Sequence, residues 1–122
     1  MFTRKLTTSE AKLISQRITQ DGRYCDPRIT IQQIGNLTVM AVSGGRYAEI
    51  RDTDGHGVGV ILPCGENRAV EVVLGWNDLY TVRRVRLIVN GARRGEVTVE
   101  TETNDLYFDQ LPDTVYCAST WK

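Results

Sequence analysis

The chain has few of the residues on which catalytic and metal sites most often depend. Its 122 residues include one histidine, His56, and three cysteines, Cys25, Cys64 and Cys117. An odd number of scattered cysteines gives no disulfide framework, and the sequence has no C-x-x-C, no H-E-x-x-H and no phosphate-binding glycine loop. Any mechanism that needs a histidine must therefore use His56.

Long hydrophobic runs and an excess of one charge are also missing. No window approaches the ~20 apolar residues of a membrane span, and residues 1–6 do not resemble a signal peptide. The 15 basic and 15 acidic side chains cancel, which argues against strong nonspecific binding to a polyanion. We expect a cytosolic protein with reduced thiols and no membrane partner.

The overall composition of the chain is that of one folded domain, which we expect to cover residues 1–122. The hydrophobic fraction is 41% and the charged fraction 25%, as in soluble globular proteins. A chain this long buries roughly two thirds of the surface that its unfolded form exposes, so it needs no metal or disulfide for stability. We therefore expect no cofactor.

The hydrophobic pattern predicts an α+β fold with one helix, an antiparallel meander of about five to seven strands, and a short helical tail. A capping box at residues 7–10 begins a helix over roughly Thr8 to Gln20, and Asp21-Gly22 ends it. Pro112 argues against an unbroken helix in the tail. We expect the helix and the tail to cover one sheet face. The predicted strands, joined by Gly and Asn/Asp turns, are 28–31, 37–42, 47–51, 58–62, 69–74, 79–89 and 96–103.

The apolar alternation changes phase in the strand over residues 79–89. Tyr80 and Val82 have one parity, whereas Val85 and the apolar residues after it have the other. Because side chains alternate with period two, one added residue would account for the change, and a β-bulge at Arg83-Arg84 is predicted. The following hairpin would then place Arg84 opposite Glu100.

Three short stretches resemble a known set of sequences. They are A-V-S-G-G-R at residues 41–46, N-D-L-Y-T-V at 77–82 and Y-F-D-Q-L-P-D at 107–113. They resemble the A-I-S-G-G-R, N-D-x-Y-T-V and Y-x-D-Q-L-x-D motifs of small uncharacterised proteins from actinobacterial phages and prophages. The resemblance implies a phage or prophage origin, and it assigns no catalytic residue.

The leading hypothesis is a non-enzymatic accessory protein of a bacteriophage or prophage. It would bind a host or phage protein, or a second copy of itself, in the host cytoplasm, with virion association left open. Trp76 and Trp121 are the aromatic candidates for a partner surface, and Trp121 is the first that we expect to be exposed. The aromatic residues Trp76, Tyr80, Tyr107, Phe108, Tyr116 and Trp121 could together form a partner surface, but most of them are expected in the core.

An alternative is binding of nucleic acid through an arginine-rich hairpin. Its basic residues are Arg83, Arg84, Arg86, Arg93 and Arg94, and Arg93 and Arg94 lie at the tip. A two-stranded ribbon of this kind can contact phosphates. Neutralisation by Glu96, Glu100 and Glu102 across the hairpin is the competing interpretation, and the zero net charge favours it.

A second alternative is a small enzyme that uses the loop Asp52, Asp54 and His56, with a cysteine such as Cys64 as nucleophile. The D-x-D-G start is similar to a calcium loop, but the twelfth residue from Asp52 is Pro63 where that loop needs glutamate. A solvated turn rich in Asp and Gly is the simpler interpretation. We therefore predict neither a metal site nor a catalytic residue.

Overall fold

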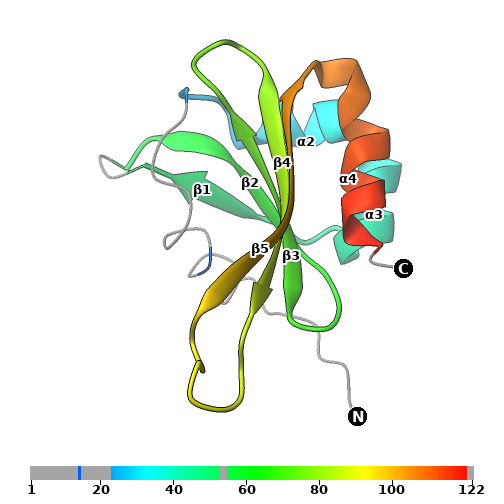
Figure 1. Ribbon diagram of the computed structural model, residues 1–122. Helices are drawn as coiled ribbons and strands as arrows, with labels where there is room; N and C mark the ends of the chain where they lie inside the picture. Colours follow the sequence, from blue (N-terminus) through cyan, green and yellow to red (C-terminus); the bar gives the residue numbers. More distant parts are fainter. Residues whose placement is uncertain (1–13, 15–22, 53–54, 121–122) are drawn as a thin grey trace.

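The computed structural model describes residues 14, 23–52 and 55–120. Figure 1 shows the helices lying on one side of a twisted sheet, so the predicted α+β class is confirmed. The elements in chain order are α2 (Pro27–Ile34), α3 (Asn36–Ser43), β1 (Ala48–Arg51), β2 (Gly57–Pro63), β3 (Arg68–Leu74), β4 (Tyr80–Leu87), β5 (Val97–Leu106), η1 (Phe108–Gln110) and α4 (Leu111–Ser119).

The sheet is antiparallel, as predicted, and its strand order, which the sequence leaves open, is β1-β2-β3-β4-β5. The pairs Leu87–Val97 and Val85–Val99 join β4 to β5 in the expected register, but Arg84 lies opposite Thr101 and not opposite Glu100 as predicted. None of the helices in the described ranges combines the length and apolar character that a bilayer crossing needs.

Both faces of the sheet are apolar and covered. On one face, β2, β3 and β4 pack against α2, α3 and α4 through buried residues that include Val60, Val72 and Leu111. On the other face, a second cluster gathers Ile50, Val73 and Ile14. The predicted helix over Thr8 to Gln20 lies outside the described residues, apart from Ile14, which is helical and buried. Ile14 packs in the cluster on the sheet face opposite α4, whereas the predicted helix and the tail were expected on one face; the rest of that helix lies outside the described residues.

The predicted strands 28–31 and 37–42 are wrong, because these residues form α2 and α3. The Asp26 carboxylate caps α2 by accepting from the amide of Arg28 at 2.9 Å, and Pro27 occupies the first turn, where no amide is needed. Gly44 ends α3 in the left-handed conformation at φ +66°. These local stop and start signals outweigh the strand preference of the intervening Ile, Thr and Val side chains.

The phase change in β4 is real, but the predicted cause is wrong. β4 keeps an unbroken register with β3 from Leu74–Tyr80 to Arg68–Arg86. Val82 packs against the helices and Val85 packs in the cluster on the opposite face, so the change follows from burial on both faces. A register shift does occur between Arg84 and Val85, but the extra residue, Glu100, belongs to β5.

The tail is more helical than the position of Pro112 suggests. Pro112 lies in the first turn of α4, where its missing amide costs no hydrogen bond, and the helix continues through Ser119. Leu111 and Val115 are buried one turn apart against the sheet.

Candidate functional site

A cleft of about 370 Å³ opens where the N-terminal end of α2, the β3–β4 turn and η1 meet. We call it the aromatic cleft. It is lined by Arg23, Tyr24, Cys25, Asp26, Ile29, Gln33, Leu74, Asp78, Tyr80, Tyr107 and Phe108.

Backbone hydrogen bonds fix the walls of the aromatic cleft. The amide of Arg23 donates to the carbonyl of Leu74 at 2.7 Å, and that of Cys25 donates to the carbonyl of Gly57 at 2.9 Å. The segment that leads into α2 is thereby held against β2 and β3. On the opposite wall, the side chain of Gln110 accepts from the amide of Tyr107 at 2.8 Å and braces η1.

Large apolar side chains at the mouth of the aromatic cleft face solvent. Tyr24 is 50% exposed, Ile29 52%, Phe108 60% and Tyr107 62%. Trp76, on the β3–β4 turn, is 65% exposed, and its ring centroid lies 6.3 Å from that of Tyr24. Aromatic groups left exposed together are a common mark of an interaction surface.

The floor of the aromatic cleft is polar but holds no activated nucleophile. The hydroxyl of Tyr80 donates to the amide oxygen of Gln33, and the hydroxyl of Thr30 lies 3.7 Å from the sulfur of Cys25. Burial raises the pKa of both the Tyr80 phenol and the Cys25 thiol above their ordinary values. Both groups are therefore neutral near pH 7 and act as hydrogen-bonding groups.

Charged side chains beside the aromatic cleft already have partners within the chain. Arg23 pairs with Asp78, and Arg28 pairs with Asp26 at 3.1 Å. The hydrogen bonds from Arg28 hold the pKa of Asp26 below its usual value. These charges cancel in pairs, so a ligand with much net charge would gain little here.

The structure brings only some of the predicted site residues together. Trp76 lies beside Tyr24 near the aromatic cleft, whereas Trp121 and Asp54 lie outside the described residues. His56 stacks on Tyr24 with a centroid distance of 4.1 Å, and its amide donates to the Asp52 carboxylate at 2.9 Å. The loop is therefore an Asp-stabilised turn packed beside an aromatic ring.

The structure does not bring Cys64 to His56. The two residues flank β2 at its opposite ends, roughly 25 Å apart at the rise of an extended strand. Cys64 is buried in the helix-side core, and burial raises the pKa of its thiol to about 12. Within the described ranges, no three His, Cys, Asp or Glu side chains gather in a way that could hold a metal ion.

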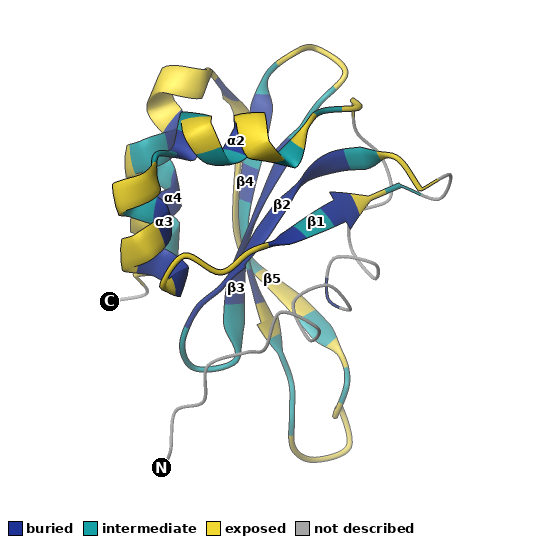
Figure 2. Cartoon of the chain, turned by 180° about the vertical axis from the view of Figure 1, so that it is seen from behind, coloured by how far each residue is buried: buried dark blue, intermediate teal, exposed yellow. Residues whose placement is uncertain are grey.

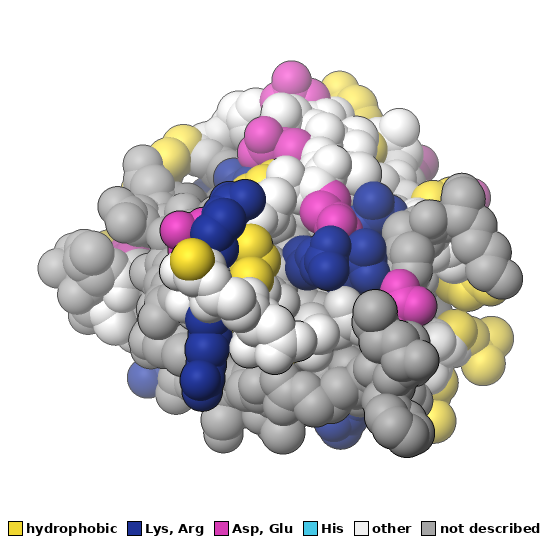
Figure 3. Space-filling model, turned by 60° about the horizontal axis from the view of Figure 1, so that its bottom comes forward, with side chains coloured by type: hydrophobic (Ala, Val, Ile, Leu, Met, Phe, Trp, Pro, Cys, Tyr) yellow, Lys and Arg dark blue, Asp and Glu magenta, His cyan; other side chains and the backbone are white. Residues whose placement is uncertain are grey.

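Most of the arginine hairpin is neutralised by carboxylates. Arg84 pairs with Glu100 at 2.9 Å and Arg93 with Glu96 at 2.6 Å. Arg83 pairs with Glu102 at 2.8 Å and lies 3.8 Å from the buried Glu71. Figure 3, which brings the hairpin end of the molecule forward, shows basic and acidic side chains interleaved. Nucleic-acid binding stays a prediction, with Arg86 and Arg94 as the exposed cations that have no ion pair among the described residues.

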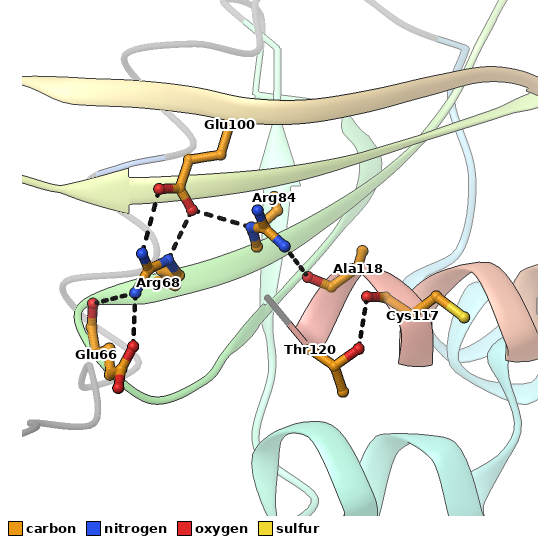
Figure 4. Close-up of polar contacts among 7 residues, drawn as sticks. All are labelled: Glu66, Arg68, Arg84, Glu100, Cys117, Ala118 and Thr120. Carbon is orange, nitrogen blue, oxygen red and sulfur yellow. Dashed lines mark hydrogen bonds and ion pairs between the residues drawn. The ribbon is translucent and has the colours of Figure 1, made fainter. Parts of the chain in front are cut away.

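The carboxylate of Glu100 connects strands β3, β4 and β5 and, through Arg84, helix α4. Figure 4 shows Glu100 of β5 between Arg68 of β3 and Arg84 of β4, with Arg84 also reaching the carbonyl of Ala118. Arg68 donates two hydrogen bonds to Glu100, at 2.7 and 3.3 Å. The arginine side chains are 13% and 14% exposed, so we regard the group as a structural clamp.

Sequence reasoning missed most of the residues that form the mouth of the aromatic cleft. The expectation that most of the six aromatic residues lie in the core is wrong for those that the structure describes, because Tyr80 is buried but Trp76, Tyr107, Phe108 and Tyr116 are exposed. Tyr24 and Ile29 were not identified at all. The D-P start of α2 was the available signal, because a helix beginning at Pro27 places Ile29 in its first turn.

Comparison of the chain with protein-family models, with curated proteins and with solved structures found no match.

Proposed function

We propose that this chain is a non-enzymatic accessory protein of a bacteriophage or prophage that binds a host or phage protein at the aromatic cleft. The observation that carries the proposal is the set of exposed apolar side chains at its mouth, Tyr24, Ile29, Tyr107 and Phe108, with the exposed Trp76 beside Tyr24. Large aromatic residues dominate the energetics of protein interfaces because they bury much area at little cost in side-chain entropy.

The chemistry of the aromatic cleft supports binding over catalysis. The thiol and phenol at its floor have raised pKa values, and the charges beside it are paired. A partner would gain mainly from apolar contact, with the side-chain nitrogen of Gln33, whose oxygen accepts from Tyr80, as a donor for a directional hydrogen bond. The resemblance to actinobacterial phage sequences supplies the proposed origin, and the host cytoplasm or the virion is the proposed place of binding.

The test is affinity capture from an infected or lysogenic actinobacterial host, followed by calorimetry with the purified captured protein. The double variant Ile29→Ser and Phe108→Ser removes one exposed apolar side chain from each wall. We expect at least tenfold weaker binding, since truncating each interface anchor costs on the order of 1–2 kcal/mol. The control, Arg94→Ser, changes the opposite end of the sheet and should bind as the wild type does.

Equal affinity in the wild type and the double variant would contradict the proposal. So would a loss of affinity confined to Arg94→Ser, since that result would move the binding surface to the arginine hairpin. Circular dichroism of each variant distinguishes lost contact from lost folding.

A further inference from the structure

Helix α3 has apolar side chains on two opposite sides. Val39 and Val42 are buried against the sheet, whereas Leu37 is 87% and Met40 is 61% exposed. Figure 2 shows this outer side of the helix layer largely in yellow, the colour of exposed residues. A helix that is apolar all round is normally buried all round, so the outer side of α3 has the composition of an interface.

Charge indicates which partner this surface fits. The eight residues of α3, Asn36–Ser43, include no ionisable side chain. In a two-fold interface each residue meets its own copy or a symmetric mate, so a patch with charge of one sign repels itself. An uncharged apolar helix face is free of that repulsion, and antiparallel pairing would also oppose the two helix dipoles favourably.

Two other exposed surfaces, the β5 edge and the tip of the arginine hairpin, are poorly suited to self-pairing. The edge strand β5 contains Glu100 and Glu102 and two register shifts, features that prevent regular edge-to-edge pairing. The tip of the arginine hairpin would place Arg93 and Arg94 close to the same cations of a second copy. Of these surfaces, the outer side of α3 is the one on which identical copies meet without charge repulsion.

We propose that two copies of this chain associate through the outer side of α3. Leu37 and Met40 pack against the same residues of the second copy, and the neighbouring helix α4 widens the contact with Tyr116, which is 51% exposed. A stable dimer buries about 800 Å² on each partner, and since this contact is centred on one short helix we expect weak association, with a dissociation constant on the order of micromolar. No lining residue of the aromatic cleft lies on α3, so this inference is independent of the proposed function.

Sedimentation equilibrium of the full chain over about 1–300 µM tests the dimer, a range that brackets micromolar association. We expect the wild-type mass to rise from one chain toward two. The variant Leu37→Glu with Met40→Glu should weaken association at least tenfold, because four carboxylates would meet at the interface. The control, Phe108→Ser, removes an exposed apolar side chain elsewhere and should dimerise as the wild type does.

A wild-type chain that stays monomeric over this range would overturn the inference and leave the surface to a different protein. A dimer that persists unchanged in the double variant would also overturn it, because association would then use another surface. Leu37 is almost fully exposed, so its substitution costs little packing. If the double variant fails to fold, Leu37→Lys alone gives the same comparison.

Discussion

At the scale of single residues, Glu100 connects segments that are distant in the sequence. Its carboxylate accepts from Arg68 on β3 and from Arg84 on β4, and Arg84 also reaches the end of α4. Burial opposes ionisation of Glu100, but the hydrogen bonds and positive charges of the two arginines outweigh it and lower its pKa. The ionised carboxylate therefore stabilises the folded state.

Glu100→Gln should reduce the free energy of unfolding by about 2 kcal/mol at pH 7, the scale of a hydrogen bond to a charged group. Because the folded-state pKa lies below the ordinary value, the wild-type advantage is complete well above pH 4.5. It is lost as the pH falls through the lower folded pKa. Urea unfolding measures this at pH 7 and at about pH 3. The difference in free energy of unfolding between the wild type and Glu100→Gln should be smaller at the lower pH.

The matched control is Glu96→Gln, which breaks the exposed pair with Arg93 at a cost below about 0.5 kcal/mol. An effect of Glu100→Gln that is the same at both pH values, or no larger than that of the control, would show that Glu100 does not act as a buried charged clamp.

The sequence was informative for some of these residues and uninformative for others. The predicted register places Arg84 opposite Glu100, but Arg84 lies opposite Thr101; the two side chains still form an ion pair, because Glu100 is the extra residue beside it in β5. Arg68 was not predicted as a partner. It lies on β3 and reaches Glu100 on β5 across β4, whereas the alternation of side chains along strands predicts contacts only between neighbouring strands. Trp76 is a surface candidate from the sequence, but Phe108 is not distinguished from the aromatic residues expected mostly in the core, since sequence pattern does not show which side of a one-turn helix is covered.

At the scale of elements, the contact between β2 and β3 depends on one glycine. A Cβ atom at Gly59 would lie 2.1 Å from the carbonyl oxygen of Val72 and 2.9 Å from the Cα of Val73. Both neighbours are backbone in the middle of the sheet, so neither can move without disturbing the ladder.

Gly59→Ala should therefore lower the free energy of unfolding by at least about 2 kcal/mol, measured by chemical denaturation. The control is Gly91→Ala in the β4–β5 hairpin, where a Cβ atom meets no atom within 4 Å. Only the left-handed backbone at φ +84° penalises that change, at roughly 1 kcal/mol. If Gly59→Ala lost no more free energy of unfolding than Gly91→Ala, the close packing at Gly59 would be contradicted.

The five strands could be predicted because their apolar alternation and turn residues agree with each other. Helices α2 and α3 could not be predicted from alternation, since Ile, Thr and Val in runs of four to six residues suit either structure. The Asp26-Pro27 start and the Gly44-Gly45 stop were the decisive signals, and they act through hydrogen bonds of the backbone, which hydrophobic periodicity does not report.

At the scale of the whole molecule, the two proposed contact surfaces belong to different parts of the helix layer. The aromatic cleft lies where α2 and η1 meet the β3–β4 turn, and the dimer surface lies on the outer side of α3. A dimer would carry two aromatic clefts, so a partner with repeated sites would bind with higher apparent affinity than either cleft provides alone.

The most direct test of the central claim is site-specific photo-crosslinking in the host cell. A photoreactive phenylalanine analogue replaces Tyr107 at the mouth of the aromatic cleft or, as control, Arg94 at the tip of the hairpin. The proposed function predicts one dominant adduct with a protein other than this chain from position 107, and none from position 94. Adducts only from position 94, or no adduct from position 107, would contradict it.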